Sequence, residues 1–162
     1  MKINKEVLTS AMKNSISDVL ETMFFLPVDF DDSVSLDEFW DPDKDKIIAA
    51  RLDFYGPLSG YCILYIPEKL SVSITADFMG KEEKDISNEQ ARGTLMEITN
   101  MITGNAFSLY DPEAVFNLGV PELVGLDDFH KDFSDSEDRI SIAIDTLENR
   151  LAFQMSIKKC LK

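Results

Sequence analysis

One stretch of the sequence combines two helical patterns: Leu95-Met96-Glu97-Ile98-Thr99-Asn100-Met101-Ile102-Thr103-Gly104-Asn105-Ala106. Ser87, followed three residues later by Gln90, has the spacing of a capping box, so we expect a helix over about residues 87–109. At about 100° per residue, one face of this helix is apolar and should pack on the core. The residues of that face are Ala91, Leu95, Ile98, Ile102 and Leu109.

The opposite face carries a second stripe, which we call the ridge: Gly93, Glu97, Asn100 and Gly104, with Met101 beside them. A glycine inside a helix costs about 1 kcal/mol relative to alanine, so two of them around a carboxylate and an amide are unusual. Because glycine has no side chain, the backbone of another molecule could approach this face closely. The alternative is an ordinary solvated helix face whose glycines have no function.

A similar stripe occurs near the N-terminus, where we expect a first helix over residues 4–25. Its apolar face would carry Leu8, Met12, Ile16, Val19 and Met23. Behind that face, Ser17, Glu21 and Phe24 repeat the spacing of Gly93, Glu97 and Asn100. Since a phenyl ring makes no conventional hydrogen bond, any site on this copy should be degenerate. A chance similarity between two amphipathic helices is the other reading.

The rest of the chain predicts strands, one short helix and turns. Residues 48–55 alternate as in a half-buried strand, and the apolar run 61–66 should be a central strand covered on both faces. Residues 70–79 predict a short helix, 114–124 an irregular or edge strand, and 140–157 an antiparallel hairpin. We therefore expect a single domain, residues 1–162, of the α+β class. Its antiparallel β-sheet would be flanked by long helices and built from two pseudo-repeats.

Composition excludes several classes of protein. The chain has 162 residues and a formal net charge of −14, which argues against a nucleic-acid binder and against anionic membrane surfaces. No apolar run approaches the ~20 residues of a membrane span, and the first residues lack the apolar core of a signal peptide. Cys62 and Cys160 have no metal-type spacing and indicate buried free thiols in a reducing cytoplasm.

Other patterns for metals and catalysis are weak. Asp41, Asp43 and Asp45 have the spacing that opens a calcium loop, but the glycine and the closing glutamate of that loop are missing. His130, the sole histidine, lies in an acidic segment without a nucleophile in a recognisable motif. No phosphate-binding loop or dinucleotide fingerprint occurs, so we expect no metal and no cofactor of the protein's own.

The run Glu97-Ile98-Thr99-Asn100, followed by residues 101–106, resembles the CheC/CheX/FliY family of chemotaxis phosphatases, whose hallmark is Glu-x-x-Asn on a long helix. The stretch 73–80 and the β-rich ending are also similar to CheX, so the likeness spans nearly the whole chain. The family often has Asp or Ser where this chain has Gly93, which puts any contact of that side chain in doubt.

This resemblance implies dephosphorylation of a CheY-like response regulator in two-component signalling. Asn100 would orient a water for attack on the phospho-aspartate, and Glu97 would pair with the regulator's lysine. The regulator would supply Mg²⁺. One intact site instead of two favours CheX, which implies a homodimer. The alternative is a non-catalytic module that binds the regulator or sits in a motor switch, as the FliM middle domain does; an unrelated small-molecule enzyme is a distant third.

Overall fold

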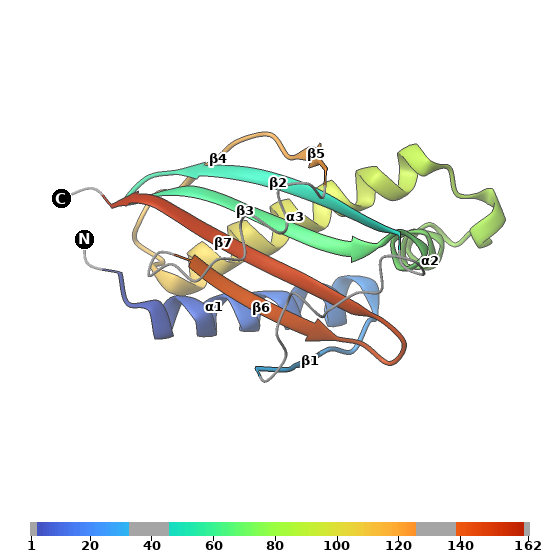
Figure 1. The fold of residues 1–162 in the computed structure, drawn as a ribbon, viewed down its shortest axis with the longest axis horizontal. Helices are drawn as coiled ribbons and strands as arrows, with labels where there is room; N and C mark the ends of the chain where they lie inside the picture. The colour runs from blue at the N-terminus through green and yellow to red at the C-terminus, as the bar shows by residue number, and fades with distance from the viewer. Residues whose placement is uncertain (1–2, 33–45, 126–138, 161–162) are drawn as a thin grey trace.

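Seven antiparallel strands form one sheet in the computed structural model, which describes residues 3–32, 46–125 and 139–160. The order is β1-β6-β7-β3-β2-β4, and β5 also pairs with β2 (Figure 1). The strands are β1 (Asp29–Phe30), β2 (Ile47–Tyr55), β3 (Leu58–Pro67), β4 (Asn117–Leu118), β5 (Glu122–Val124), β6 (Arg139–Asp145) and β7 (Arg150–Cys160). The predicted α+β class with an antiparallel sheet is confirmed.

The middle of the sheet agrees closely with the sequence pattern. β3 lies between β2 and β7 and is buried along nearly its whole length, as the continuous apolar run predicted. The β3–β7 register shifts at Gly60, where an added Cβ would lie 2.0 Å from the Ser156 carbonyl oxygen, so only glycine fits this close approach. β6 and β7 form the predicted hairpin, and β4 and β5 are short edge strands.

Helices cover one face of the sheet (Figure 1). They are α1 (Lys5–Ser17), the π-helix η1 (Asp18–Met23), α2 (Glu68–Met79), the short 3₁₀ helix η3 (Glu83–Asp85) and α3 (Asn88–Tyr110). α1 and α3 run antiparallel against the sheet, and α2 stands beside the end of η1 and the beginning of α3 (Figure 1). The main core lies between this helical layer and the sheet.

The first helix differs from its prediction in its last turns. Residues 18–23 form a π-helix, in which a turn takes about one residue more than an α-turn. The apolar stripe therefore shifts by one position after Leu20: Phe24 is buried, and Met23, predicted in the core, is 43% exposed. The expectation that Phe24 lies on the same outer face as Ser17 and Glu21 is wrong for this reason.

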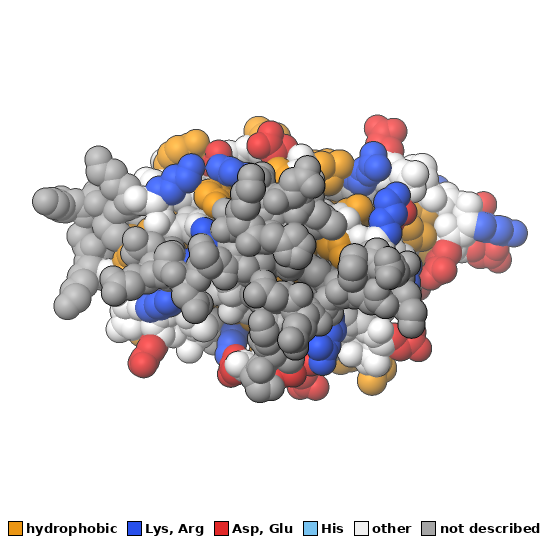
Figure 2. Space-filling view, in the orientation of Figure 1, with side chains coloured by type: hydrophobic (Ala, Val, Ile, Leu, Met, Phe, Trp, Pro, Cys, Tyr) orange, Lys and Arg blue, Asp and Glu red, His pale blue; other side chains and the backbone are white. Residues whose placement is uncertain are grey.

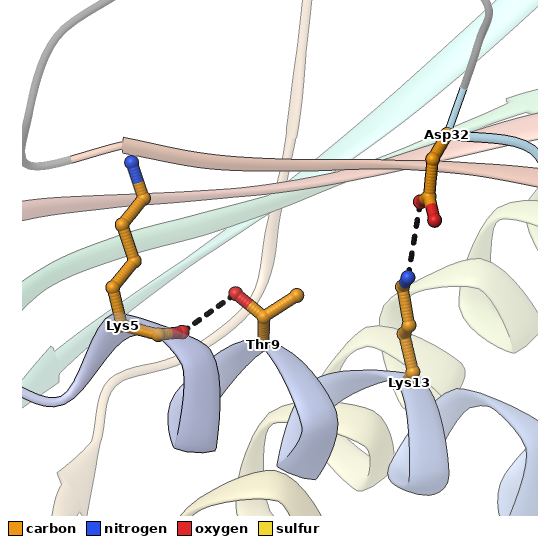
Figure 3. Close-up of polar contacts among 4 residues, drawn as sticks. All are labelled: Lys5, Thr9, Lys13 and Asp32. Carbon is orange, nitrogen blue, oxygen red and sulfur yellow. Dashed lines mark hydrogen bonds and ion pairs between the residues drawn. The ribbon is translucent and has the colours of Figure 1, made fainter.

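Contacts from α1 hold the chain that follows η1. Lys13 reaches from α1 to Asp32, just after β1, with Nζ 3.0 Å from the carboxylate oxygen (Figure 3). One turn earlier on the same side, the Thr9 hydroxyl donates to the Lys5 carbonyl oxygen at 2.7 Å (Figure 3).

The aspartates 41, 43 and 45, the segment around them and the loop containing His130 lie outside the described residues.

Candidate functional site

The ridge lies on the outer surface of α3. Glu97 and Gly93 are exposed, while Asn100, Met101 and Gly104 are half-buried. The opposite face of the helix packs in the core through Ala91, Leu95, Ile98 and Ile102, as the spacing predicted. The carboxylate and the amide therefore lie on the outer face of the helix, as the spacing predicted.

A capping box begins α3, and two hydrogen bonds from other helices fix its position. At its N-terminus the predicted capping box is present, with the Ser87 hydroxyl accepting from the Gln90 amide and the Gln90 side chain accepting from the Ser87 amide. From α1, the buried Ser15 hydroxyl donates to the Ile102 carbonyl oxygen at 2.6 Å. From α2, the buried Ser71 hydroxyl donates to the Ala91 carbonyl oxygen at 2.9 Å. The two hydroxyl contacts flank the segment that carries Glu97 and Asn100, so the ridge stands on a rigid support.

Charges at the beginning of α3 also favour the helix. Acidic side chains gather at the end of the molecule where α2 is joined to α3, around the turn Glu83–Asp85 (Figure 2). Glu89 adds a carboxylate in the first turn of α3. Negative charge near a helix N-terminus is stabilising because the unpaired backbone N–H groups there carry partial positive charge.

The C-terminal turn of α3 is packed differently from the prediction. Leu109, expected in the core, is 46% exposed, and Phe107 is buried instead. The chain after α3 folds back over the helix, so the ring of Phe116 stacks on Phe107 with 4.1 Å between centroids. Phe54 of β2 meets the same ring edge-on at 4.7 Å. These contacts involve residues distant in sequence, which helical spacing alone could not reveal.

The two ridge glycines have different surroundings. A Cβ built on Gly93 would meet no atom within 4 Å, so this position is open to an approaching molecule. A Cβ on Gly104 would lie 3.5 Å from Cδ1 of Leu118, so β4 borders the ridge at this end. The accessible part of the ridge therefore extends from Gly93 to about Asn100.

The side chains of Glu97 and Asn100 make no hydrogen bond or ion pair with any residue in the described part of the chain. An amide can donate and accept hydrogen bonds, and a carboxylate can pair with a lysine. Within the described ranges no group of three His, Cys, Asp or Glu side chains could hold a metal ion. These two side chains offer hydrogen bonds and a negative charge to a second molecule.

The repeat of the ridge on the first helix is not assembled as predicted. Glu21 is exposed and Ser17 half-buried, but Phe24 packs inward, with its ring centroid 5.3 Å from that of Phe78. The exposure of the next residue was not expected from the sequence. Phe25 is 82% exposed and has φ 54°, a conformation that bulky residues rarely adopt. The two adjacent phenylalanines, Phe24 and Phe25, were the feature of the sequence that could have pointed to this exposed ring.

Cys62 is the buried free thiol that the sequence indicated. Burial raises its pKa to about 12, and a hydrogen bond with the Thr103 side chain lowers it in part. A thiol in this environment is a packing residue, since the reactive form is the thiolate. The side chain of Cys160, at the end of β7, lies outside the described side chains.

Comparisons with known proteins identify the family. Residues 48–145, a range that contains all of α3, match the family profile described as chemotaxis phosphatase CheX. No match is found among curated protein sequences. No helix in the described part of the chain is long and apolar enough to cross a membrane.

Solved structures share the fold at low sequence identity. CheX from Vibrio vulnificus has 18% identity and a TM-score of 0.70, covering 97% of this chain and 100% of that one. CheX in the CheX–CheY–BeF₃–magnesium complex from Borrelia burgdorferi has 13% identity and a TM-score of 0.67, covering 93% and 97%. The FliM middle domain from Vibrio alginolyticus has 10% identity and a TM-score of 0.56, covering 95% and 92%. With its family profile matched over more than half its length, the chain belongs to the CheX family.

Proposed function

We propose that this protein hydrolyses the aspartyl phosphate of a CheY-like response regulator, using the exposed ridge of α3. The observation that carries the proposal is the presentation of Glu97 and Asn100 on the outer face of a helix whose other faces are packed. The family is described as a chemotaxis phosphatase, and a relative of the same fold is known in complex with CheY.

Asn100 would orient the attacking water. Phosphoryl transfer needs little covalent chemistry from the protein, so catalysis depends on positioning and on stabilising charge. An amide can hold a water through its carbonyl oxygen without placing a negative charge beside the phosphoryl oxygens. The regulator would contribute the phosphorylated aspartate and its Mg²⁺.

Glu97 would fix the docked regulator by pairing with its active-site lysine. The carboxylate is exposed and, within the described residues, has no partner, so it is available to a cation on another molecule. Glu97 and Asn100 lie one helical turn apart, so both side chains can enter one concave site. The hydroxyl contacts of Ser15 and Ser71 to α3 would hold that pair in a constant orientation.

Phosphate release from a magnesium-bound phospho-regulator tests this proposal. Wild type should accelerate release, and Asn100→Ala should lose the acceleration by roughly 10²-fold or more, the usual effect of removing one aligned polar group. Asn105→Ala is the matched control, since Asn105 is a half-buried amide on another side of the same helix. Equal rates for Asn100→Ala and wild type would place the chemistry elsewhere.

Glu97→Ala separates docking from catalysis. Its main effect should be a higher KM, because the lost group holds the regulator and does not contact the water. Glu89→Ala, which removes an exposed carboxylate in the first turn of the same helix, controls for general charge. Unchanged affinity of Glu97→Ala for the regulator would contradict the role assigned to Glu97.

The second candidate is a binding module without catalysis. The open surface at Gly93 favours it, since close approach of a partner is useful for docking alone, and the FliM middle domain shares the fold. Tight phosphorylation-dependent binding without acceleration of phosphate release would select this candidate. The homodimer expected from the family resemblance stays a prediction, which sedimentation of the full chain would test.

A further inference from the structure

The edge of the sheet beside the ridge carries exposed apolar side chains. β4 and β5 pair with β2 and form the edge of the sheet on that side (Figure 1). Leu118 is half-buried, Leu123 is 42% exposed, and Val120, which lies between the two strands, is 87% exposed. We call these three side chains the apolar edge. Single exposed apolar side chains are common on proteins, so the meaning of this group depends on where it lies.

The strand register brings the apolar edge to the side of the sheet on which α3 packs. Leu118 pairs with Phe54 and Leu123 pairs with Ala50, and both of these β2 residues belong to the core between the sheet and the helices. Residues that pair across neighbouring strands project on the same face of the sheet. Leu118 reaches the ridge directly, because its Cδ1 lies 3.5 Å from a Cβ built on Gly104.

Leu123 lies beside the part of α3 that carries the two polar ridge residues. α2 begins beside the start of β2, and its Ser71 hydroxyl donates to the Ala91 carbonyl oxygen. The start of β2 is therefore near Ala91, and its end is near Gly104, which Leu118 adjoins. Leu123 pairs with β2 between these two ends, and β5 lies next to α3. Leu123 thus flanks the segment between Ala91 and Gly104.

Asn100 lies on the flank of α3 that faces the apolar edge. Asn100 and Phe107 are about 20° apart in a helical projection, because seven residues make nearly two turns. The Phe107 ring packs against Phe54 of β2 and against Phe116, which precedes β4. The amide is therefore placed between the open surface of α3 and the edge of the sheet.

α1, on the other side of α3, has a different surface. Its exposed side chains are mostly polar or charged: Lys5, Glu6, Ser10 and Asn14, with Val7 as an exception. Charged residues are depleted at the centre of protein interfaces, where apolar side chains are excluded from water. Of the two surfaces beside the ridge, the apolar edge is the one suited to close contact with a partner.

We propose that the receiver domain of the regulator covers the apolar edge when its phosphoryl group lies at Asn100. This inference rests on the proposed function. A specific interface covers roughly 800 Å² on each partner, which is the area of a disc of about 16 Å radius. A helix with its side chains is only about 10–12 Å across, so a receiver centred on Asn100 extends beyond α3 on at least one side. The receiver should accordingly present an uncharged, apolar surface beside its phosphorylation site.

Leu123→Glu and Leu123→Lys test whether the receiver covers this edge. A charge on an open surface costs little, whereas a charge enclosed by a partner without a counter-charge is strongly unfavourable. Both variants should therefore raise Kd and KM by about tenfold or more, whichever sign the charge has. Val120→Glu should act in the same direction, and it decides the question if the Leu123 variants fail to fold, because Val120 is the more exposed side chain.

Binding of the full chain to each CheY-like receiver of the same genome, loaded with BeF₃⁻ and Mg²⁺, is measured by calorimetry alongside phosphate release. Thermal unfolding of each variant shows whether it is folded. Leu147→Glu and Leu147→Lys are the matched controls, since Leu147 is 95% exposed in the turn between β6 and β7, on the far side of β3 from the apolar edge. These controls, and the conservative variant Leu123→Met, should match wild type.

The outcomes separate this inference from the proposed function. If wild type accelerates phosphate release and the folded variants of the apolar edge keep its Kd and KM, the inference is refuted and the phosphatase stands. If Glu and Lys shift Kd in opposite directions, equally at Leu123 and Leu147, only net charge matters and the inference is again refuted.

If wild type binds a receiver without accelerating release, and the variants of the apolar edge lose that binding, the phosphatase is refuted and the inference about the docking surface stands. If no receiver binds wild type, both are refuted. A change in sedimenting mass with unchanged receiver binding would assign the apolar edge to a second copy of the chain and refute its role here.

Discussion

Gly93→Ala should make the protein more stable and less able to dock its partner. The position is in the interior of α3, is exposed, and has no atom within 4 Å of an added Cβ. Alanine there is favoured over glycine by about 1 kcal/mol because it lowers the entropy of the unfolded chain without a clash. For a chain of this length, that corresponds to a melting temperature roughly 2–4 °C higher.

The same methyl group should weaken docking. A partner backbone in contact with the bare helix at Gly93 would have to move away from the new Cβ, and overpacking of a fitted contact typically costs about 1–3 kcal/mol. We therefore expect KM for the phospho-regulator to rise by roughly 5- to 150-fold, since about 1.4 kcal/mol corresponds to a factor of ten. Thermal unfolding and phosphate-release kinetics on the same preparation measure both effects.

Two other glycines serve as controls for Gly93→Ala. Gly80→Ala also adds a methyl group to open space, but at φ 66°, so it should lower the melting temperature. Gly104→Ala should be tolerated, because its Cβ would make an ordinary contact with Leu118 at 3.5 Å. A stabilised Gly93→Ala protein with unchanged KM would refute close docking at this glycine. A destabilised one would refute the open helical geometry of the site.

Two further predictions concern the support beneath the ridge. Ser15→Ala should cost about 1 kcal/mol of stability and roughly 2–4 °C in melting temperature, because it removes a buried hydrogen bond to the Ile102 carbonyl oxygen. Ser10→Ala, at an exposed serine of the same helix, is the control. Equal melting temperatures for the two variants would contradict the contact. For Cys62, the pKa is raised on folding to about 12, so the stability contributed by the protonated thiol is complete below about pH 9 and is lost as the pH rises toward 12. In a Cys160→Ser background, native protein at about pH 8 should resist iodoacetamide until denaturant is added, and rapid labelling would show that Cys62 is accessible.

Most elements could be predicted because their signals are local. The capping box at Ser87 and Gln90 marks the beginning of α3, and the apolar run at 61–66 marks the central strand β3. Alternation in β6 and β7 predicted the hairpin. Gly119 and Pro121 indicated one irregular or edge strand over 114–124, where the structure has the two short strands β4 and β5. Each signal depends on residues within a few positions of one another, which is the range over which spacing carries information.

The errors have causes that act over longer distances or through rare geometry. Leu109 and Phe107 exchange their expected burial because Phe116, from the chain after α3, stacks on the helix from the other side. Met23 and Phe24 exchange theirs because a π-turn shifts the stripe by one residue. A helical projection at constant 100° per residue cannot anticipate either event. The ridge was placed correctly because α3 is regular from Gly93 to Gly104.

The same one-residue shift explains how two similar helices come to present different surfaces. On α3 the regular helix keeps Glu97 and Asn100 outward beside the bare Gly93, which suits a site that must enter a partner closely. On the first helix the π-turn buries Phe24 and brings Met23 to the surface, so the position that would match Asn100 packs inward and offers no hydrogen bond. An amide that is to orient a water needs a fixed direction, which a regular and well-packed helix provides. The π-turn therefore leaves Glu97 and Asn100 on α3 without a counterpart on the outer face of the first helix.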